Sequence, residues 1–111
     1  MKTKASRNHL SVAASYPCII CGASEVELHH VSTGAGMGRK NPDCHVVSLC
    51  HTHHRTGGHG IALHAGQRTW EANYGKQEEL LYTFLTQMEN DGNLTEYALP
   101  KLLELRLKYG N

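Results

Sequence analysis

Two short pairs of potential metal ligands constrain the fold of this 111-residue chain more than any other feature. Cys18 and Cys21 frame a two-residue turn, and Cys50 and His53 repeat that spacing further along. Three thiolates and an imidazole form a set that zinc binds tetrahedrally in structural sites. One C-x2-C pair is a weak signal, but two pairs separated by a strand-loop-strand segment are a strong one. We therefore predict a zinc ion whose binding stabilises a small core.

The cellular compartment decides how the four cysteines are interpreted, because disulfides are rare in a reducing compartment. The N-terminal segment MKTKASRNHLSVAASYP has no apolar run typical of a signal peptide, and no window approaches a membrane span. We expect a cytoplasmic protein, in which cysteines are metal ligands or free thiols rather than disulfides. Cys44 stands outside the predicted site, as a core thiol or an alternative ligand. The competing interpretation is that all four are free cysteines.

The segment between the two ligand pairs predicts a hairpin. Residues 26–30 and 46–49 are short runs rich in β-branched and apolar residues, which is typical of strands. Residues 31–43 hold three glycines and a proline and are predicted to form a loop. A loop of that length in a compact domain usually has a function. A short helical turn is expected to begin at Cys50 and to end at residues 56–58.

The second half of the chain predicts helices. Residues 67–74 form a short helix stopped by Gly75, and residues 76–90 carry apolar side chains at helical spacing. The tail alternates apolar and charged residues, as a strand would, but its strong helix formers and Pro100 favour a helix. We predict an α+β fold with a basic N-terminal arm (1–16), a central domain (17–90) and a C-terminal helical extension (91–111).

Histidines outside the zinc set indicate a second site. His29 and His30 are consecutive at the end of a strand, so their side chains point to opposite faces. His54 directly follows the zinc ligand His53 and must also point elsewhere, and His59 and His64 come shortly after. Two or three imidazoles could bind a metal with open coordination positions, as catalytic sites do. The alternatives are a second structural zinc or an inert cluster.

This order of motifs resembles a known superfamily. C-x2-C, the histidine doublet, a glycine-rich loop and C-x2-H-H resemble the HNH endonucleases, which share a ββα-metal motif. The segments GAGMGRK, LCHTHHRTGGHGIALHAG and TWEANYGKQEELL are similar to the Ref family, phage recombination-enhancement nucleases that cut DNA in a RecA-dependent way. The resemblance covers roughly residues 17–85. It implies an HNH fold with additional C-terminal helices, encoded by a phage or prophage.

The resemblance also implies roles for individual residues. His30 corresponds to the general base, since an imidazole accepts a proton near neutral pH. His29 and His54 correspond to ligands of a catalytic Mg²⁺ or Mn²⁺ ion, which stabilises charge on the phosphate and the leaving oxygen. For the third ligand we favour His64 over His59, because the Ref-like His-Ala-Gly begins at His64. His45 stands where HNH proteins have an asparagine that braces the loop.

Basic residues predict where DNA would lie. Single-stranded or displacement-loop DNA, with a RecA filament as partner, is the substrate that the resemblance implies. Contacts to its phosphates would set affinity rather than sequence choice. We find no base-reading helix, so cutting directed by structure or partner is expected. The predicted contacts are Lys2, Lys4 and Arg7 in the arm, Arg39 and Lys40 in the loop, and Arg55 and Arg68 beyond it.

Two other functions remain open from the sequence. One is a zinc-stabilised DNA- or protein-binding module whose nuclease site has decayed, which the histidine at position 45 allows. The other is an HNH nuclease of restriction or homing type that acts without RecA. The net charge of +1 neither supports nor excludes nucleic-acid binding.

Overall fold

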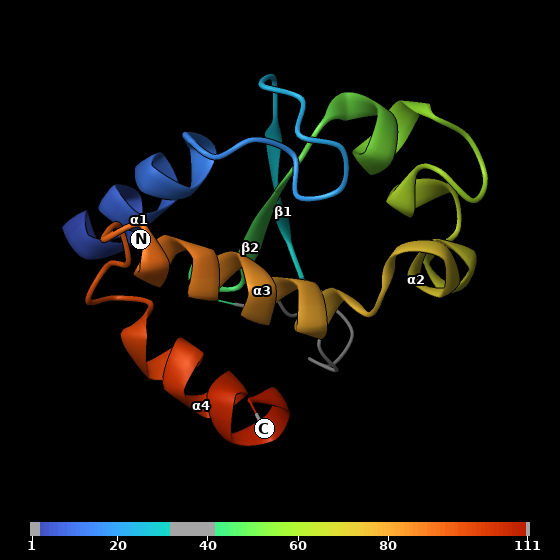
Figure 1. Ribbon diagram of the computed structural model, residues 1–111. Helices are drawn as coiled ribbons and strands as arrows, with labels where there is room; N and C mark the ends of the chain where they lie inside the picture. The colour runs from blue at the N-terminus through green and yellow to red at the C-terminus, as the bar shows by residue number, and fades with distance from the viewer. Residues whose placement is uncertain (1–2, 32–41, 111) are drawn as a thin grey trace.

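A small antiparallel hairpin surrounded by helices forms the protein (Figure 1). The computed structural model describes residues 3–31 and 42–110. This architecture confirms the predicted α+β class. None of the described helices is long and apolar enough to cross a membrane. The elements are α1 (Lys4–Ala14), β1 (Glu27–His30), β2 (Val46–Leu49), the π-helical turn η1 (Thr52–Thr56), the 3-10 turn η2 (Leu63–Ala65), α2 (Gln67–Tyr74), α3 (Gln77–Asn90) and α4 (Leu99–Tyr109).

The elements between residues 46 and 110 follow the sequence pattern closely. β2 has the bounds that were predicted, and α2 ends where Gly75 adopts a φ of 111°. That left-handed conformation strains a residue with a side chain, so glycine is the natural stop. The tail is the predicted helix, α4, with its proline in the first turn.

The N-terminal segment that we predicted to be a basic arm contains a packed helix. Residues 4–14 form a helix whose first turn is capped, because the Thr3 hydroxyl accepts the Ser6 N–H at 3.1 Å. His9 and Ala13 on its inner face are fully buried. The Ser48 hydroxyl donates to the Ala13 carbonyl at 2.7 Å and fastens the helix to β2. α1 is therefore part of the packed domain.

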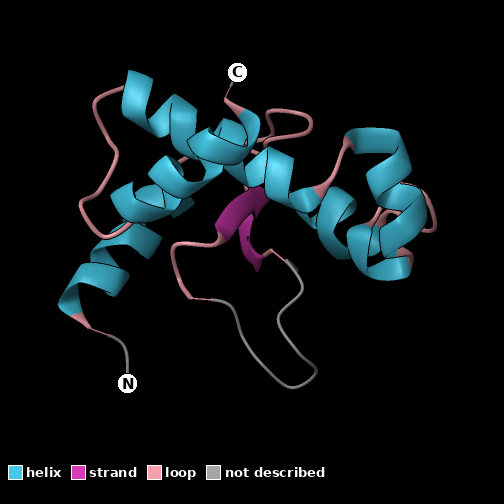
Figure 2. Cartoon of the chain, turned by 90° about the horizontal axis from the view of Figure 1, so that it is seen from below, coloured by secondary structure: helices cyan, strands magenta, loops and turns pink. Residues whose placement is uncertain are grey.

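The core lies between α3 and the hairpin. In Figure 1, α3 crosses in front of the strands, with α1 and α4 on one side and η1, η2 and α2 on the other. Figure 2 shows the same hairpin at the centre, with helices on both sides. Leu81, Leu85 and Met88 on α3 are fully buried together with Leu49 of β2 and Leu102 of α4. The hairpin, which carries His29 and His30 on β1 and leads from β2 into the histidine-rich turn η1, is thus held by one continuous core.

We expect Leu85→Ala to destabilise the fold strongly. Its side chain is fully buried, so truncation removes apolar contacts and leaves a cavity, at a cost of about 2–5 kcal/mol. Leu107→Ala is the matched control, since this leucine is 89% exposed and its loss should change stability by no more than about 0.5 kcal/mol. Thermal unfolding followed by circular dichroism, with zinc in excess, measures both. Equal melting temperatures would contradict this placement of the core.

Candidate functional site: two clusters of metal-binding side chains

The first cluster begins with the turn that carries Cys18 and Cys21. The turn closes when the Gly22 N–H donates to the Cys18 carbonyl at 2.8 Å, and Gly22 has a φ of 79°. The Ile19 N–H donates to the Ser48 carbonyl at 3.0 Å, so the turn is tied to β2. Cys50 comes directly after β2 and therefore lies beside it.

The four predicted ligands lie close enough together to hold one metal ion. The Sγ atoms of Cys21 and Cys50 are 3.7 Å apart, and the Cys50 Sγ is 3.2 Å from His53 Nδ1. The Cys18 Sγ lies 4.0 Å from the same nitrogen. With Zn–S bonds of about 2.3 Å, two sulfurs of a tetrahedral site are about 3.8 Å apart. These residues fit a metal ion such as zinc.

Two further interactions prepare this cluster for a metal. Burial alone would raise the pKa of the Cys18 thiol, but backbone N–H groups, that of Cys50 first, outweigh burial and lower it, which favours the thiolate that metals bind. The Trp70 indole donates to the His53 carbonyl at 3.1 Å, and the ring of Tyr74 packs edge-on against the His53 imidazole. α2 thereby holds His53 in place.

Cys44 lies outside the cluster as a half-buried free cysteine, and burial raises its pKa.

The second cluster consists of His29, His54 and His64, which the structure brings together as we predicted. One ring nitrogen from each lies within 4.8 Å of the others. His54 Nε2 and His64 Nε2 are 3.0 Å apart, and the His29 ring packs edge-on against both imidazoles. Two imidazole nitrogens bonded to one metal at about 2.1 Å are roughly 3.0–3.4 Å apart. The trio could therefore hold a metal ion.

The π-helical turn η1 explains how adjacent histidines serve different clusters. His53 faces the cysteines and His54 faces His29 and His64. Single π-helical turns are rare and often occur at functional sites. The same division occurs on β1, where His29 joins the trio while His30 contacts Asp43.

Two residues that sequence analysis missed orient the trio. Glu27 Oε1 accepts a hydrogen bond from His54 Nδ1 at 2.7 Å, and Gln77 Oε1 accepts one from His29 Nε2 at 2.8 Å. These bonds leave His54 Nε2 and His29 Nδ1 as the unprotonated nitrogens, which are the ones able to bind metal. Burial first, then the neighbouring histidines, lowers the pKa of His29 to about 4 despite the Gln77 bond, so its ring stays neutral. Burial also lowers the pKa of His64.

Glu27 joins several basic side chains through one carboxylate. It accepts hydrogen bonds from Arg55 through both Nε and Nη2, and from His51 Nδ1 at 2.7 Å in addition to His54. Arg55 is the main reason that the pKa of Glu27 falls to about 2, followed by His54. Glu27 could have been noticed in the sequence, because residues two apart on a strand share a face and His29 is two residues later. Gln77 has no such local signal.

His30 has a carboxylate partner of its own. Its Nε2 lies 2.9 Å from Asp43 Oδ1, and the carboxylate is 13% exposed. His30 is paired with Val46 in the hairpin register, so the residues just before β2 lie beside it. That relation follows from an antiparallel hairpin, and it is the signal by which Asp43 could have been found.

His45 braces the hairpin with its backbone. Its N–H donates to the Pro42 carbonyl at 2.9 Å, and its carbonyl accepts the Val31 N–H at 2.7 Å. The side-chain Nδ1 is buried and hydrogen-bonds to none of the described residues, and burial lowers the pKa of the ring. The predicted side-chain brace of the loop falls on residues 32–41, outside the described residues.

The remaining predicted residues separate into different regions. His59 Nδ1 lies 3.3 Å from the Ala65 carbonyl and is not part of the trio. Arg55 is engaged by Glu27, whereas Arg68 lies on α2. Lys4 and Arg7 lie on α1, across the hairpin from α2 (Figure 1). Lys2, Arg39 and Lys40 lie outside the described residues.

A hollow of about 320 Å³ opens beside the trio. It is lined by two of the three histidines and by the η2 turn that leads into α2. The trio is therefore accessible from outside, as a site that acts on a substrate must be.

The fold and its two clusters define a small α+β protein with a three-cysteine, one-histidine site beside a three-histidine site. The chain belongs to DUF968, a family of proteins of unknown function, whose model matches residues 1–90. It is also similar to the uncharacterized protein YdfU of Escherichia coli (strain K12), with 37% identity over 71 residues. That alignment covers 62% of this chain and 19% of the relative, so the matched part is about a fifth of the relative's length.

Proposed function

We propose that this protein is a metal-dependent nuclease of the HNH type, which hydrolyses phosphodiester bonds in DNA. The observation that carries the proposal is the pair of neighbouring histidines on β1. His29 enters a three-imidazole cluster open to a hollow, while His30 pairs with a carboxylate. A metal site beside a histidine–aspartate pair supplies both an electrophile and a base, which hydrolysis of a phosphodiester needs.

The chain's own residues divide the reaction between them. His30 Nε2–H donates to Asp43, so His30 Nδ1 is left to accept a proton from the attacking water. Asp43 fixes the ring orientation and stabilises the imidazolium that forms. His29, His54 and His64 would hold a catalytic divalent ion, with Glu27 fixing the tautomer of His54 and Gln77 that of His29. When bound, that ion stabilises negative charge on the phosphate and the leaving oxygen.

The finer part of the proposal concerns substrate and partner. The Ref-like segments support cutting of recombination intermediates, such as displacement loops, in the presence of a RecA filament. A cleavage assay with magnesium or manganese should compare naked plasmid with a RecA-formed displacement loop. Cutting only of the RecA complex supports the full proposal. Equal cutting of naked DNA supports the nuclease activity but contradicts its dependence on RecA. If neither substrate is cut, the nuclease proposal is wrong.

One observation favours a second candidate function. The His45 imidazole stands at the HNH asparagine position, and its buried Nδ1 has no partner among the described residues. A site that had lost its asparagine could survive as a zinc-stabilised binding module. That function predicts DNA or protein binding that is indifferent to His30→Ala, with no cleavage under any metal.

Glu27→Ala is expected to weaken metal binding by the trio about 10- to 100-fold. The carboxylate fixes the tautomer and the ring of His54, and loss of such a support typically costs that much affinity. Isothermal titration of zinc-loaded protein with Mn²⁺ measures the effect. His51→Ala is the matched control, because His51 also contacts Glu27 but lies outside the trio. The Mn²⁺ affinity of this variant should therefore equal that of the wild type. Unchanged binding by Glu27→Ala would contradict the assigned ligands.

A further inference from the structure

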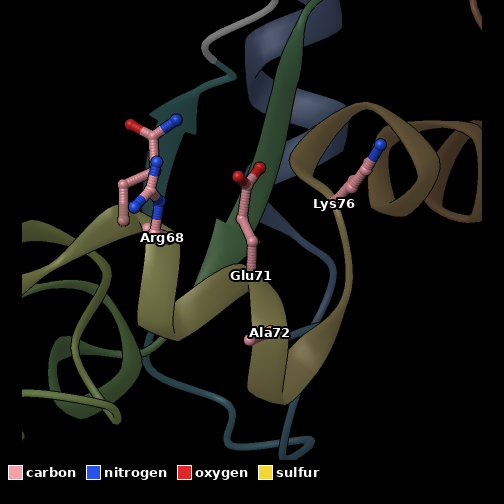
Figure 3. A pocket seen from close by; sticks show the side chains of 5 residues that line it. Arg68, Glu71, Ala72 and Lys76 are labelled. Atoms are coloured by element: carbon pink, nitrogen blue, oxygen red, sulfur yellow. The ribbon is translucent and has the colours of Figure 1, made fainter.

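A second and larger hollow adjoins the one beside the histidine trio. It has a volume of about 560 Å³ and runs along α2 to the start of α3, with Arg68, Glu71, Ala72 and Lys76 in its lining (Figure 3). Gln67, the first residue of α2, lines both hollows. Together they form what we call the α2 groove, which leads from His64 past Arg68 to Lys76.

The two cations of the α2 groove have no carboxylate partner within the part of the chain that the structure describes. Arg55, Arg106 and Lys108 elsewhere are each paired with a glutamate. Arg68 and Lys76 form no such pair, although Figure 3 shows them on either side of Glu71. Their charges are therefore available to an anion from outside.

The carboxylate between them has another task. Glu71 Oε2 accepts the Gln77 N–H at 2.9 Å, at the first residue of α3. A backbone N–H at a helix N-terminus offsets part of a negative charge. Glu71 therefore connects α2 to α3 instead of pairing with either cation, but its remaining charge opposes an anionic ligand.

We infer that the α2 groove binds the stretch of DNA strand that flanks the scissile phosphate, with Arg68 and Lys76 each contacting a backbone phosphate. The inference rests on the proposed nuclease function and gives its substrate a path across the protein. We choose a single strand as the ligand, because single strands bind in positively charged grooves that track their backbone. Because both cations are assigned to phosphates, which carry no sequence information, we expect binding to be independent of sequence.

Binding of a short fluorescein-labelled oligothymidylate, measured by anisotropy on zinc-loaded protein without magnesium or manganese, tests the inference. Arg68→Gln and Lys76→Gln are each expected to weaken binding about three- to tenfold and to lower the salt slope by about 0.7. Glu71→Gln should tighten binding, because the amide oxygen can still accept the Gln77 N–H while the opposing charge is gone. Lys108→Gln on α4 is the control with the same charge change, and it should bind as the wild type does.

The outcomes separate this inference from the function on which it rests. In cleavage assays, the Arg68 and Lys76 variants should raise KM and leave kcat unchanged, because they contact the strand away from the reacting phosphate. If the wild type cuts DNA and both variants bind DNA as tightly as the wild type, the inference about the groove is wrong and the nuclease proposal stands. Weakened binding by both variants in a protein that never cuts would support the groove and contradict the nuclease. A wild type that neither binds nor cuts would overturn both.

Discussion

Cys50→Ser should leave a chain that no longer folds cooperatively. The Cys50 sulfur lies beside both the Cys21 sulfur and the His53 imidazole, at the point where β2 ends. Removing this sulfur breaks the link between the turn that carries Cys18 and Cys21 and the histidine-rich turn η1. A structural zinc contributes about 10–16 kcal/mol of apparent binding free energy, whereas small domains are stable by only about 5–15 kcal/mol. Loss of the metal is therefore expected to cost most or all of the net stability.

The single tryptophan makes this loss easy to measure. Trp70 is buried and its indole donates to the carbonyl of His53, so its fluorescence and near-ultraviolet circular dichroism report on the metal cluster. We expect Cys50→Ser to show the spectrum of an exposed indole and to hold less than one zinc per chain. Chelation of zinc from the wild type should give the same spectrum, and adding zinc back should reverse it.

Cys44→Ser is the matched control for the same chemical change. Cys44 is half-buried and outside the cluster, so its serine variant should keep the zinc and the native spectrum. If Cys50→Ser kept a native spectrum without zinc, the metal would not be a main source of stability. If Cys44→Ser lost the metal as well, Cys44 would have to be a ligand.

The grouping of Cys18, Cys21, Cys50 and His53 and that of the histidine trio were predictable, because both depend on local rules. Alternation along a strand separates His29 from His30, and the C-x2-H spacing separates His53 from His54. The hairpin then needs only one register to bring the two halves of each cluster together. The position of His64 had to be taken from a resemblance, because the packing of the turn η2 against η1 and α2 places it.

The supports of the trio could not be predicted in the same way. Gln77 reaches His29 only because α3 crosses the hairpin, and no spacing in the sequence encodes that crossing. The helix α1 was missed for a different reason. Its buried face consists of Ser6, His9 and Ala13, which give almost no apolar periodicity, while Lys4 and Arg7 were interpreted as DNA contacts in a basic arm.

His30→Ala is expected to abolish cleavage while leaving the fold and both metal clusters in place. Loss of a positioned general base costs about 10²- to 10⁴-fold in rate. The side chain is 26% exposed and belongs to neither metal cluster, so its removal should change stability little. Cleavage of a displacement loop should be measured under single-turnover conditions, alongside zinc content, Mn²⁺ affinity and melting temperature. These measurements separate a lost base from a lost metal or a lost fold.

Asp43→Asn should produce a smaller loss than His30→Ala, and the two losses should not add. In the proposed mechanism Asp43 acts through the His30 ring, so the double variant should cut no more slowly than His30→Ala alone. His51→Ala is a matched control, because His51 is also bonded to a carboxylate but lies outside the proposed chemistry. A His30→Ala protein that cuts at the wild-type rate would remove the base from the mechanism. Additive losses would instead place Asp43 in a separate step.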